Sequence, residues 1–498
     1  MIRGEISLLR SWDIFDTLIS RRCIFPQNVF KIVEQISKIN GFMNVRIAAE
    51  QSIIKEGKNF NLDDIYNAMT KISNVSEDLA NKLKKLECDV EIEQTIPITE
   101  NLNKVKSGDV LISDMYLPEE IIRRMLDKVG LFVPVEIVIT SGGKANGKIW
   151  NQFKDQSTYL FHTGDNEISD VKNPRQFGFD SSWTILNRLN EFENLILEKD
   201  FEFAAYLREL RLRNPFNEDI KRIYWLLFIM NVSMLMLFVK QIDAIQKKFE
   251  FEYLGFCGRD TFYIYQLYKK FKKDKAESIP AIDYLHYSRK LIINSQKEVA
   301  KYFSNRMGNR RSLLIDLLGT GLHFNKLREK IDNPYSILIC GYLGKKISSE
   351  VYGNENFPKN WFNINEVSQN DDIKNLNFYI DDCDKDKFAW SENVEVFNRS
   401  VHNSPLRIKT FKIYNKIIPE VTFSEVNDTE NLDVFKACMK EILSSKIQWP
   451  KFENYVEIDS MLKIILQIFE IYARRFVLRN EQDVQENVDK IIKAIGKK

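Results

Sequence analysis

The chain has 498 residues, more than one hydrophobic core usually organises, so two or three domains are expected. Hydrophobic residues make up 44% and charged residues 29%, which is typical of a globular protein. Lys and Arg number 72 and Asp and Glu number 70, so charge gives no argument for nucleic acid as a partner. The six cysteines form no CxxC pair, which argues against a zinc site and a disulfide framework.

The sequence shows no export signal and one membrane candidate. The N-terminus runs into a predicted strand without a basic segment and an apolar one, so we expect a cytoplasmic protein. The uncharged run of 17 residues from Ile223 to Val239 is shorter than the ~20 residues that span a bilayer. A buried core helix is the preferred interpretation, so no firm membrane span is expected, and membrane association stays open as the alternative.

In chain order, a strand and a polar turn are predicted at 5–18, followed by helical patterns through 27–100. Pro26 is a fitting helix start, and Ser76 before Glu77 and Asp78 is a predicted N-cap with an acidic first turn. The pattern then changes to short β-rich runs at 109–114, 135–140 and 158–165, separated by helical stretches at 118–129 and 147–155. This alternation predicts an α/β domain with a parallel sheet.

A domain boundary is predicted within 188–215, where the sequence is charged and helical and ends at Pro215. A second α/β series follows, with strands expected at 250–258, 281–288, 312–319 and 335–344. The predicted layout is a core of 1–23 and 101–190, a helical block at 24–100, a second α/β domain at 200–350, and a region at 351–498 that is first irregular and then helical.

Four predicted strand ends in the first domain carry polar residues. Asp13, Asp16 and Thr17 follow the first strand, Ser113 and Asp114 the second, Lys144 the third, and Asp165 and Asp170 the fourth. Open parallel sheets place their sites at these ends. A carboxylate can attack phosphorus, carboxylates hold Mg²⁺, and a lysine with a hydroxyl can neutralise phosphoryl oxygens, so the set predicts phosphoryl chemistry.

The set Asp13-x-x-Asp16-Thr17, Ser113, Lys144 and Gly164-Asp165 with Asp170 resembles the four motifs of the haloacid dehalogenase superfamily. The resemblance covers about residues 5–185 and implies a Rossmann-like sheet, with the helical block as the inserted cap. The stretches "ISDMYLP" and "GDNEISD" are similar to a subgroup of long proteins from bacterial surface-polysaccharide gene sets. The implied substrate is a small phosphorylated metabolite such as a sugar or polyol phosphate.

The resemblance also implies a role for each residue. Asp13 would be the nucleophile, Thr17 would occupy the fourth position after it, Ser113 would bind the phosphoryl group, and Lys144 would neutralise nucleophile and phosphate. Lys148 is the alternative to Lys144, and Asp114 is a candidate for binding the substrate or another anion. Mg²⁺ would be held by Asp13, the backbone carbonyl of Phe15, Asp165 and, in support, Asp170.

One position departs from the phosphatase pattern. The second Asp, which protonates the leaving oxygen, is replaced by Phe15. General acid help is typically worth 10²–10⁴-fold. Three interpretations remain open: Asp16 or Asp114 supplies the proton, the leaving group needs none, or the domain is a weak or regulatory phosphate binder. We expect phosphoester hydrolysis or phosphoryl transfer.

The second half carries weaker signals. A Gly-Thr-Gly turn after a strand could hold phosphate and is loosely similar to the diphosphate-sugar loop of phosphoribosyltransferases. The residues proposed for a second anion or sugar-donor site are Arg259, Asp260, Arg289, Asp316, Thr320 and His323. Two rival functions follow: a sugar-transferring enzyme whose activity lies in the C-terminal α/β domain with the first domain accessory, and a non-catalytic scaffold.

Overall fold

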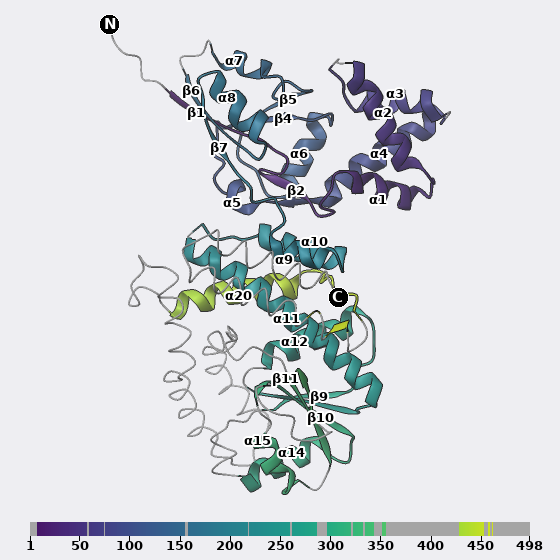
Figure 1. The fold of residues 1–498 in the computed structure, drawn as a ribbon, viewed down its shortest axis with the longest axis vertical. Helices are drawn as coiled ribbons and strands as arrows, with labels where there is room; N and C mark the ends of the chain where they lie inside the picture. The colour runs from purple at the N-terminus through teal and green to yellow at the C-terminus, as the bar shows by residue number, and fades with distance from the viewer. Residues whose placement is uncertain are drawn as a thin grey trace, which may run out of the picture. The chain divides into compact units, whose positions relative to one another are not determined.

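The chain forms two compact units in this computed structural model, Met1–Asn217 and Glu218–Lys498. The structure describes residues 7–56, 59–73, 75–154, 158–217, 219–258, 261–285, 296–319, 322–331, 334–342, 351–354, 428–452, 457–458 and 461. Both units are α/β (Figure 1). The division falls at residue 217, whereas the sequence placed the start of the second domain near residue 200.

The first unit is built on a five-stranded sheet in the order β5-β4-β1-β6-β7. Each neighbouring pair is parallel. The strands are β1 (Ser7–Trp12), β4 (Val110–Asp114), β5 (Glu136–Thr140), β6 (Thr158–Gly164) and β7 (Asp180–Trp183). In chain order the sheet reads 3-2-1-4-5, a doubly wound arrangement whose strand order reverses between β1 and β6. The sequence predicted the first four strands and missed β7.

Alternate residues of the strands face two separate apolar layers, as the period of two in a strand requires. Leu111 packs with Ile122 and Met125 of α6 (Glu119–Lys128) on one face. Val110 and Ile112 pack with Trp150 on the other face. The remaining short helical elements of this unit are α5 (Thr99–Leu102), η1 (Lys148–Trp150), α7 (Asn151–Lys154), η2 (Glu167–Lys172), α8 (Asn173–Gln176), α9 (Glu191–Leu197) and α10 (Phe201–Leu212).

Four helices between β2 (Ile19–Arg21) and β3 (Thr95–Pro97) form a distinct group, here called the helical insert (Figure 1). They are α1 (Gln27–Ser37), α2 (Phe42–Glu56), α3 (Leu62–Ser73) and α4 (Glu77–Gln94). Strands β2 and β3 pair antiparallel, so the chain leaves and re-enters through one two-stranded stem. The predicted cap of α4 is confirmed, because the Ser76 side chain accepts from the Leu79 N–H.

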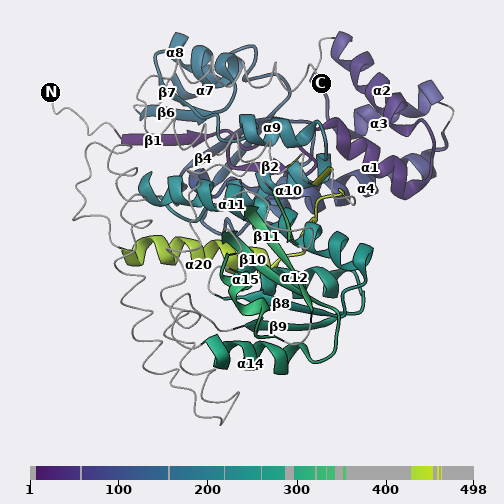
Figure 2. The same cartoon turned by 60° about the horizontal axis from the view of Figure 1, so that its bottom comes forward.

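The second unit contains another parallel five-stranded sheet, in the order β12-β11-β10-β8-β9 (Figure 2). Its strands are β8 (Tyr253–Cys257), β9 (Ala281–Leu285), β10 (Ser312–Gly319), β11 (Tyr335–Tyr342) and β12 (Val351–Asn354). Its helices include α11 (Asp219–Phe249), α12 (Phe262–Asp274), α14 (Gln296–Met307), α15 (Leu322–Arg328) and α20 (Asp428–Ser444). All predicted strands of this half are present, and β12 was not predicted.

The apolar run at 223–239 lies within α11. Its C-terminal part, including Met234, Leu237 and Val239, is fully buried within the second unit. Over the residues that the structure describes, no helix combines the length and apolar character that crossing a membrane requires. The preferred interpretation of this run as a buried helix therefore agrees with the structure.

Candidate functional site

The site lies where the first sheet reverses its strand order. Asp13 directly follows β1, and Asp165 directly follows β6, the neighbouring strand. The Asp13 N–H donates to the Thr163 carbonyl at 2.8 Å, which extends the pairing of these two strands by one residue. Open α/β sheets bind ligands at this reversal, outside the carboxyl ends of the strands. The topology therefore brings the first and fourth predicted motifs together.

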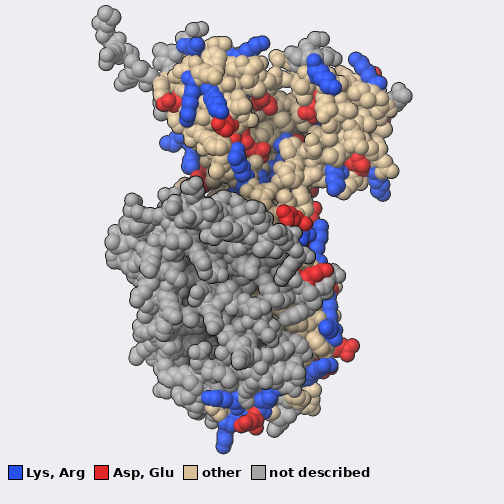
Figure 3. Space-filling model, viewed as in Figure 1, with Lys and Arg blue, Asp and Glu red and all other residues tan. Residues whose placement is uncertain are grey.

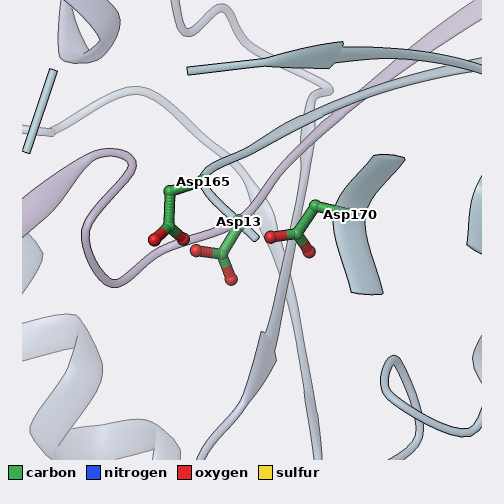
Figure 4. A group of neighbouring side chains, drawn as sticks. All are labelled: Asp13, Asp165 and Asp170. Carbon is green, nitrogen blue, oxygen red and sulfur yellow. The ribbon is translucent and has the colours of Figure 1, made fainter. Parts of the chain in front are cut away.

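Three carboxylates converge at this point (Figure 4). One oxygen from each of Asp13, Asp165 and Asp170 lies within 4.8 Å of the others. Asp13 and Asp170 are buried, and Asp165 is partly exposed. The indole N–H of Trp183 donates to the Asp165 carbonyl at 2.8 Å, which anchors the turn after β6 to β7.

Lys144 supplies the positive charge. Its Nζ forms ion pairs with Asp13 and, at 2.7 Å, with Asp170, and it also donates to the Ile112 carbonyl at 3.2 Å. Only 3% of the Lys144 side chain is exposed. Lys148 is exposed at the start of η1 and forms no part of this cluster. Of the two lysines in the loop, Lys144 therefore occupies the position next to the carboxylates.

Burial and mutual repulsion keep two of the carboxyl groups poorly ionised in the absence of a cation. Burial raises the pKa of Asp13 to about 8, Lys144 opposes the shift, and Asp170 and Asp165 add to it. Burial and the charges of Asp16 and Asp170 raise the pKa of Asp165 to about 7. One ammonium does not compensate three neighbouring carboxylates.

Asp170 differs from Asp13 and Asp165 because its hydrogen-bond and ion-pair partners favour the ionised carboxylate. Burial works to raise its pKa, but hydrogen bonding by His162 and the charge of Lys144 outweigh burial and hold the pKa below its usual range. His162 is fully buried, with Nε2 3.3 Å from Asp170 and Nδ1 2.8 Å from the Ser11 hydroxyl. A neutral imidazole that accepts from Ser11 would donate to Asp170. The sequence analysis missed His162 and Ser11, because each stands inside a strand rather than at its end.

The loop that carries Lys144 is held by side chains on both sides. The Asp114 carboxylate accepts from the Lys144 N–H at 3.0 Å, the Ala145 N–H at 2.9 Å and the Thr140 hydroxyl. The Asn173 amide donates to the carbonyls of Lys144 and Ala145 at 2.8 and 2.9 Å. Asp114 thus positions the lysine loop, whereas the sequence suggested it as an anion-site residue or a proton donor.

Gly164 permits Asp170 to approach the end of β6. A Cβ atom on Gly164 would lie 2.5 Å from the Cβ of Asp170, a separation that real side chains do not tolerate. A side chain at position 164 would therefore displace Asp170, which gives a packing reason for the glycine of the fourth motif.

The carboxylates form the floor of a cavity of about 1000 Å³ between the sheet and the helical insert. Acidic and basic side chains are visible in the hollow of the first unit in the space-filling view (Figure 3). Both the sheet side and the insert contribute to the lining, which consists of Asp13, Phe15, Arg21, Phe25, Pro26, Gln27, Phe30, Ile47, Glu50, Gln51, Ile54, Ser113, Asp114, Met115, Tyr116, Lys144, Ala145, Asp165, Asn166, Ile168, Ser169 and Asp170.

Two predicted catalytic residues do not line this cavity. Asp16 has a left-handed backbone with φ of 61°, and its carboxylate accepts from the Ser20 hydroxyl at 2.9 Å. The buried guanidinium of Arg208, from α10, also donates to Ser20, at 2.7 Å. Thr17 is fully buried, and its hydroxyl has no hydrogen-bond partner among the described residues. Both residues belong to the turn that follows Asp13, and neither is part of the cavity lining.

The predicted second site is described only in part. Arg259, Asp260, Arg289 and Thr320 lie outside the described residues. Asp316 is a partly buried residue of β10, and His323 belongs to α15, with its side chain outside the description. The reversal of strand order in this sheet falls between β8 and β10. In the sequence, Arg259 and Asp260 come after β8, Arg289 after β9 and Thr320 after β10.

The first cluster fits a hard divalent cation. Mg²⁺ prefers oxygen ligands and is usually held by one or two carboxylates with water completing the shell. Asp13 and Asp165 supply such oxygens, with Asp170 beside them. Burial, and after it the neighbouring carboxylates, raises the pKa of both groups, and a bound cation would favour their ionised forms. Lys144 already neutralises one charge on the side of Asp170.

Neither a comparison with models of protein families nor one with curated protein sequences found a match for this chain.

Proposed function

We propose that the first unit is a Mg²⁺-dependent phosphohydrolase or phosphotransferase that works through an aspartyl-phosphate on Asp13, as in the haloacid dehalogenase superfamily. One observation carries the proposal: a buried lysine contacts the carboxylate that ends the first strand, on the floor of a large cavity. A carboxylate nucleophile needs a cation beside it to approach an anionic phosphoryl group. Asp165 and Asp170 add two further carboxylates that could hold a metal ion together with Asp13.

The residues divide the chemistry as follows. An Asp13 carboxylate oxygen attacks phosphorus, the new O–P bond forms, and the bridging O–P bond breaks with its electron pair on the leaving oxygen. Lys144 holds the carboxylate in place and neutralises the phosphoryl oxygens, and Ser113 donates a hydrogen bond to one of them. A second attack on phosphorus, by water or by an acceptor hydroxyl, releases the phosphoryl group and restores Asp13.

The metal, when bound, would supply charge neutralisation at the phosphoryl oxygens. Asp13, Asp165 and the backbone carbonyl of Phe15 are its proposed ligands, with Asp170 supporting them. Asp170 itself is kept ionised by Lys144 and His162, so it can orient these groups without needing the metal.

The test is phosphate release from phosphorylated metabolites, with and without Mg²⁺. We expect wild-type release to require Mg²⁺, Asp13→Asn to abolish it, and Lys144→Met to lower it roughly 10²-fold or more. Lys148→Met is the matched control, because this lysine lies in the same loop but is exposed; it should retain near wild-type release.

Trapping with Mg²⁺ and fluoroberyllate, followed by fluorine NMR, tests the nucleophile without a substrate. The wild type should bind the phosphate mimic only with Mg²⁺ present, and Asp13→Asn should not bind it. Equal phosphate release by the wild type and Asp13→Asn would remove Asp13 from the mechanism and favour a rival function.

A further inference from the structure

The cavity also restricts which phosphate ester can react there; this inference rests on the proposed function. Attack by Asp13 leaves electron density on the bridging oxygen, and most leaving groups then need a proton. The question is which side chain near the reacting carboxylate could donate one.

Asp114 lines the cavity but is already fully engaged as an acceptor. Two backbone N–H groups and the Thr140 hydroxyl donate to its carboxylate. These three hydrogen bonds direct the carboxylate oxygens to the lysine loop. Protonation would also weaken the contacts that position the lysine loop.

Lys144 and Asp16 are also unsuited. The ammonium group of Lys144 has three N–H bonds, and they are directed to Asp13, Asp170 and the Ile112 carbonyl. Asp16 does not line the cavity, and it is tied to Ser20 in the turn behind the site. Neither residue has a proton directed at the leaving side of a phosphoryl group on Asp13. Asp165 lines the cavity beside Asp13, but it is assigned to the metal, so its carboxylate oxygens are engaged there.

The ionisable groups of the insert side are committed as well. Glu50 of α2 forms an ion pair of 2.8 Å with Arg46. Arg21 is paired with Glu91 through two hydrogen bonds of 2.8 and 2.9 Å. Burial, followed by the charge of Glu87, raises the pKa of Tyr116 well above its usual value, which makes it a poor acid.

The remaining lining is largely apolar and aromatic. Phe15 lies beside the site, with its ring 4.7 Å from the Arg21 guanidinium carbon. Phe25, Ile54 and Ile168 line the same cavity and are 49%, 54% and 60% exposed, unusually open for large apolar side chains. The basic residues among the lining are Arg21 and Lys144, and both are already paired with carboxylates.

We propose that the substrate is a phosphate monoester of an acidic, ring-bearing hydroxyl, of the phenol or enol type, without a second anionic group. An acidic hydroxyl departs as its anion and needs no proton. A flat apolar ring can contact the exposed apolar side chains of the cavity lining. A second phosphate or carboxylate would meet Glu50 and no unpaired cation. The sugar or polyol phosphate that the sequence resemblance implied is the alternative that the experiment tests.

The decisive experiment compares leaving groups of similar shape and different acidity on the full-length protein with Mg²⁺. The series is para-nitrophenyl, para-acetylphenyl, phenyl and cyclohexyl phosphate. We expect kcat/KM to fall steeply along the series, with cyclohexyl phosphate roughly 10²–10⁴-fold below phenyl phosphate, the range that a missing general acid leaves uncompensated. A shallow dependence, with cyclohexyl phosphate close to phenyl phosphate, would overturn the proposal.

A second arm tests the exclusion of a second anion. The para-carboxyphenyl ester is compared with the neutral para-chlorophenyl ester, whose leaving phenol has nearly the same acidity. We expect kcat/KM for the neutral ester to exceed that for the carboxylated ester at least about 10-fold, an amount that one unfavourable charge contact supplies. The Glu50→Gln variant should show a smaller difference between the two esters. Preference for the carboxylated ester would contradict this part of the proposal.

Failure of the inference can be told apart from failure of the proposed function. If phosphate is released from every ester with a shallow dependence, the catalytic role of Asp13 stands and the substrate class is wrong. If no ester in the series is cleaved and fluoroberyllate does not bind with Mg²⁺, the proposed function itself is wrong, and the inference falls with it.

Discussion

At Asp13, the demands of chemistry and of folding oppose each other. A nucleophile must be an ionised carboxylate, but burial raises the pKa of this group to about 8, only partly offset by Lys144. In the unfolded chain the same group ionises near its ordinary pKa of 3.8. Folding without a cation therefore takes up a proton at pH values between these two, which costs stability as the pH rises.

We expect Asp13→Asn to stabilise the metal-free protein increasingly with pH. A raised pKa in the folded state gives a contribution that is complete below about pH 4 and lost as the pH approaches 8. Asn carries no such titration, so the free energy of unfolding of the variant should match that of the wild type near pH 4 and exceed it by up to roughly 5 kcal/mol at pH 8. Denaturant unfolding in EDTA at several pH values measures the difference.

Asp170→Asn is the control with the opposite sign. The pKa of Asp170 is lowered, so its contribution is present above the ordinary Asp range and lost on acidification. This variant should be less stable than the wild type at neutral pH, and the gap should narrow as the pH falls. A pH-independent effect of Asp13→Asn would show that its carboxyl group is not held protonated by burial.

At the scale of elements, the helical insert depends on a buried ion pair. Arg46 of α2 and Glu87 of α4 are both fully buried, and two hydrogen bonds of 2.8 Å join them. The Arg46 guanidinium carbon lies 4.4 Å from the centre of the Phe30 ring and 4.9 Å from that of Tyr116. This pair fixes α2, and with it Glu50 and Ile54, which line the cavity.

Removing one partner of this pair should be costly. Arg46→Met leaves Glu87 buried without its cation, which typically costs about 3–5 kcal/mol. Arg123→Met is the matched control, because Arg123 and Glu119 form an ion pair in which both side chains are 49% exposed; it should cost less than about 1 kcal/mol. Chemical denaturation compares the two. Equal losses would mean that the buried pair does not hold the insert together.

At the scale of the whole molecule, the proposed activity belongs to one unit. Every residue of the carboxylate cluster and of the cavity lining lies within Met1–Asn217. The apolar clusters of this unit are likewise built from its own residues. A unit with its own core can in principle fold alone.

We therefore expect residues 1–217, expressed alone, to unfold in one cooperative transition and to bind Mg²⁺ with fluoroberyllate about as tightly as the full chain. Calorimetry and fluorine NMR measure these two properties. Residues 218–498, tested alongside with activated sugars, address the rival function. Sugar transfer by that half, together with a first unit that binds no phosphate mimic, would make the C-terminal domain the active one.

The sequence by itself determined much of the local structure. The strand runs, the Ser76 cap and the four groups of polar residues at strand ends were all legible, because each depends on neighbours within a few positions. The α/β class followed from the alternation of patterns, and the order of the motifs along the chain was sufficient to suggest phosphoryl chemistry. The short strands β7 and β12 were missed, because their four residues carry little periodic signal.

Only the tertiary structure decided which polar residues meet. Asp16 and Asp114 stand one position from Phe15 and Ser113 in the chain, yet the first faces the turn behind the site and the second holds the lysine loop. The sequence made Lys144 the preferred catalytic lysine and Lys148 the alternative, and the structure separates them because Lys144 is buried against Asp13 and Lys148 is exposed. Side-chain direction, burial and long-range pairing set these outcomes. They depend on strands and helices brought together from distant parts of the chain, which local sequence patterns do not encode.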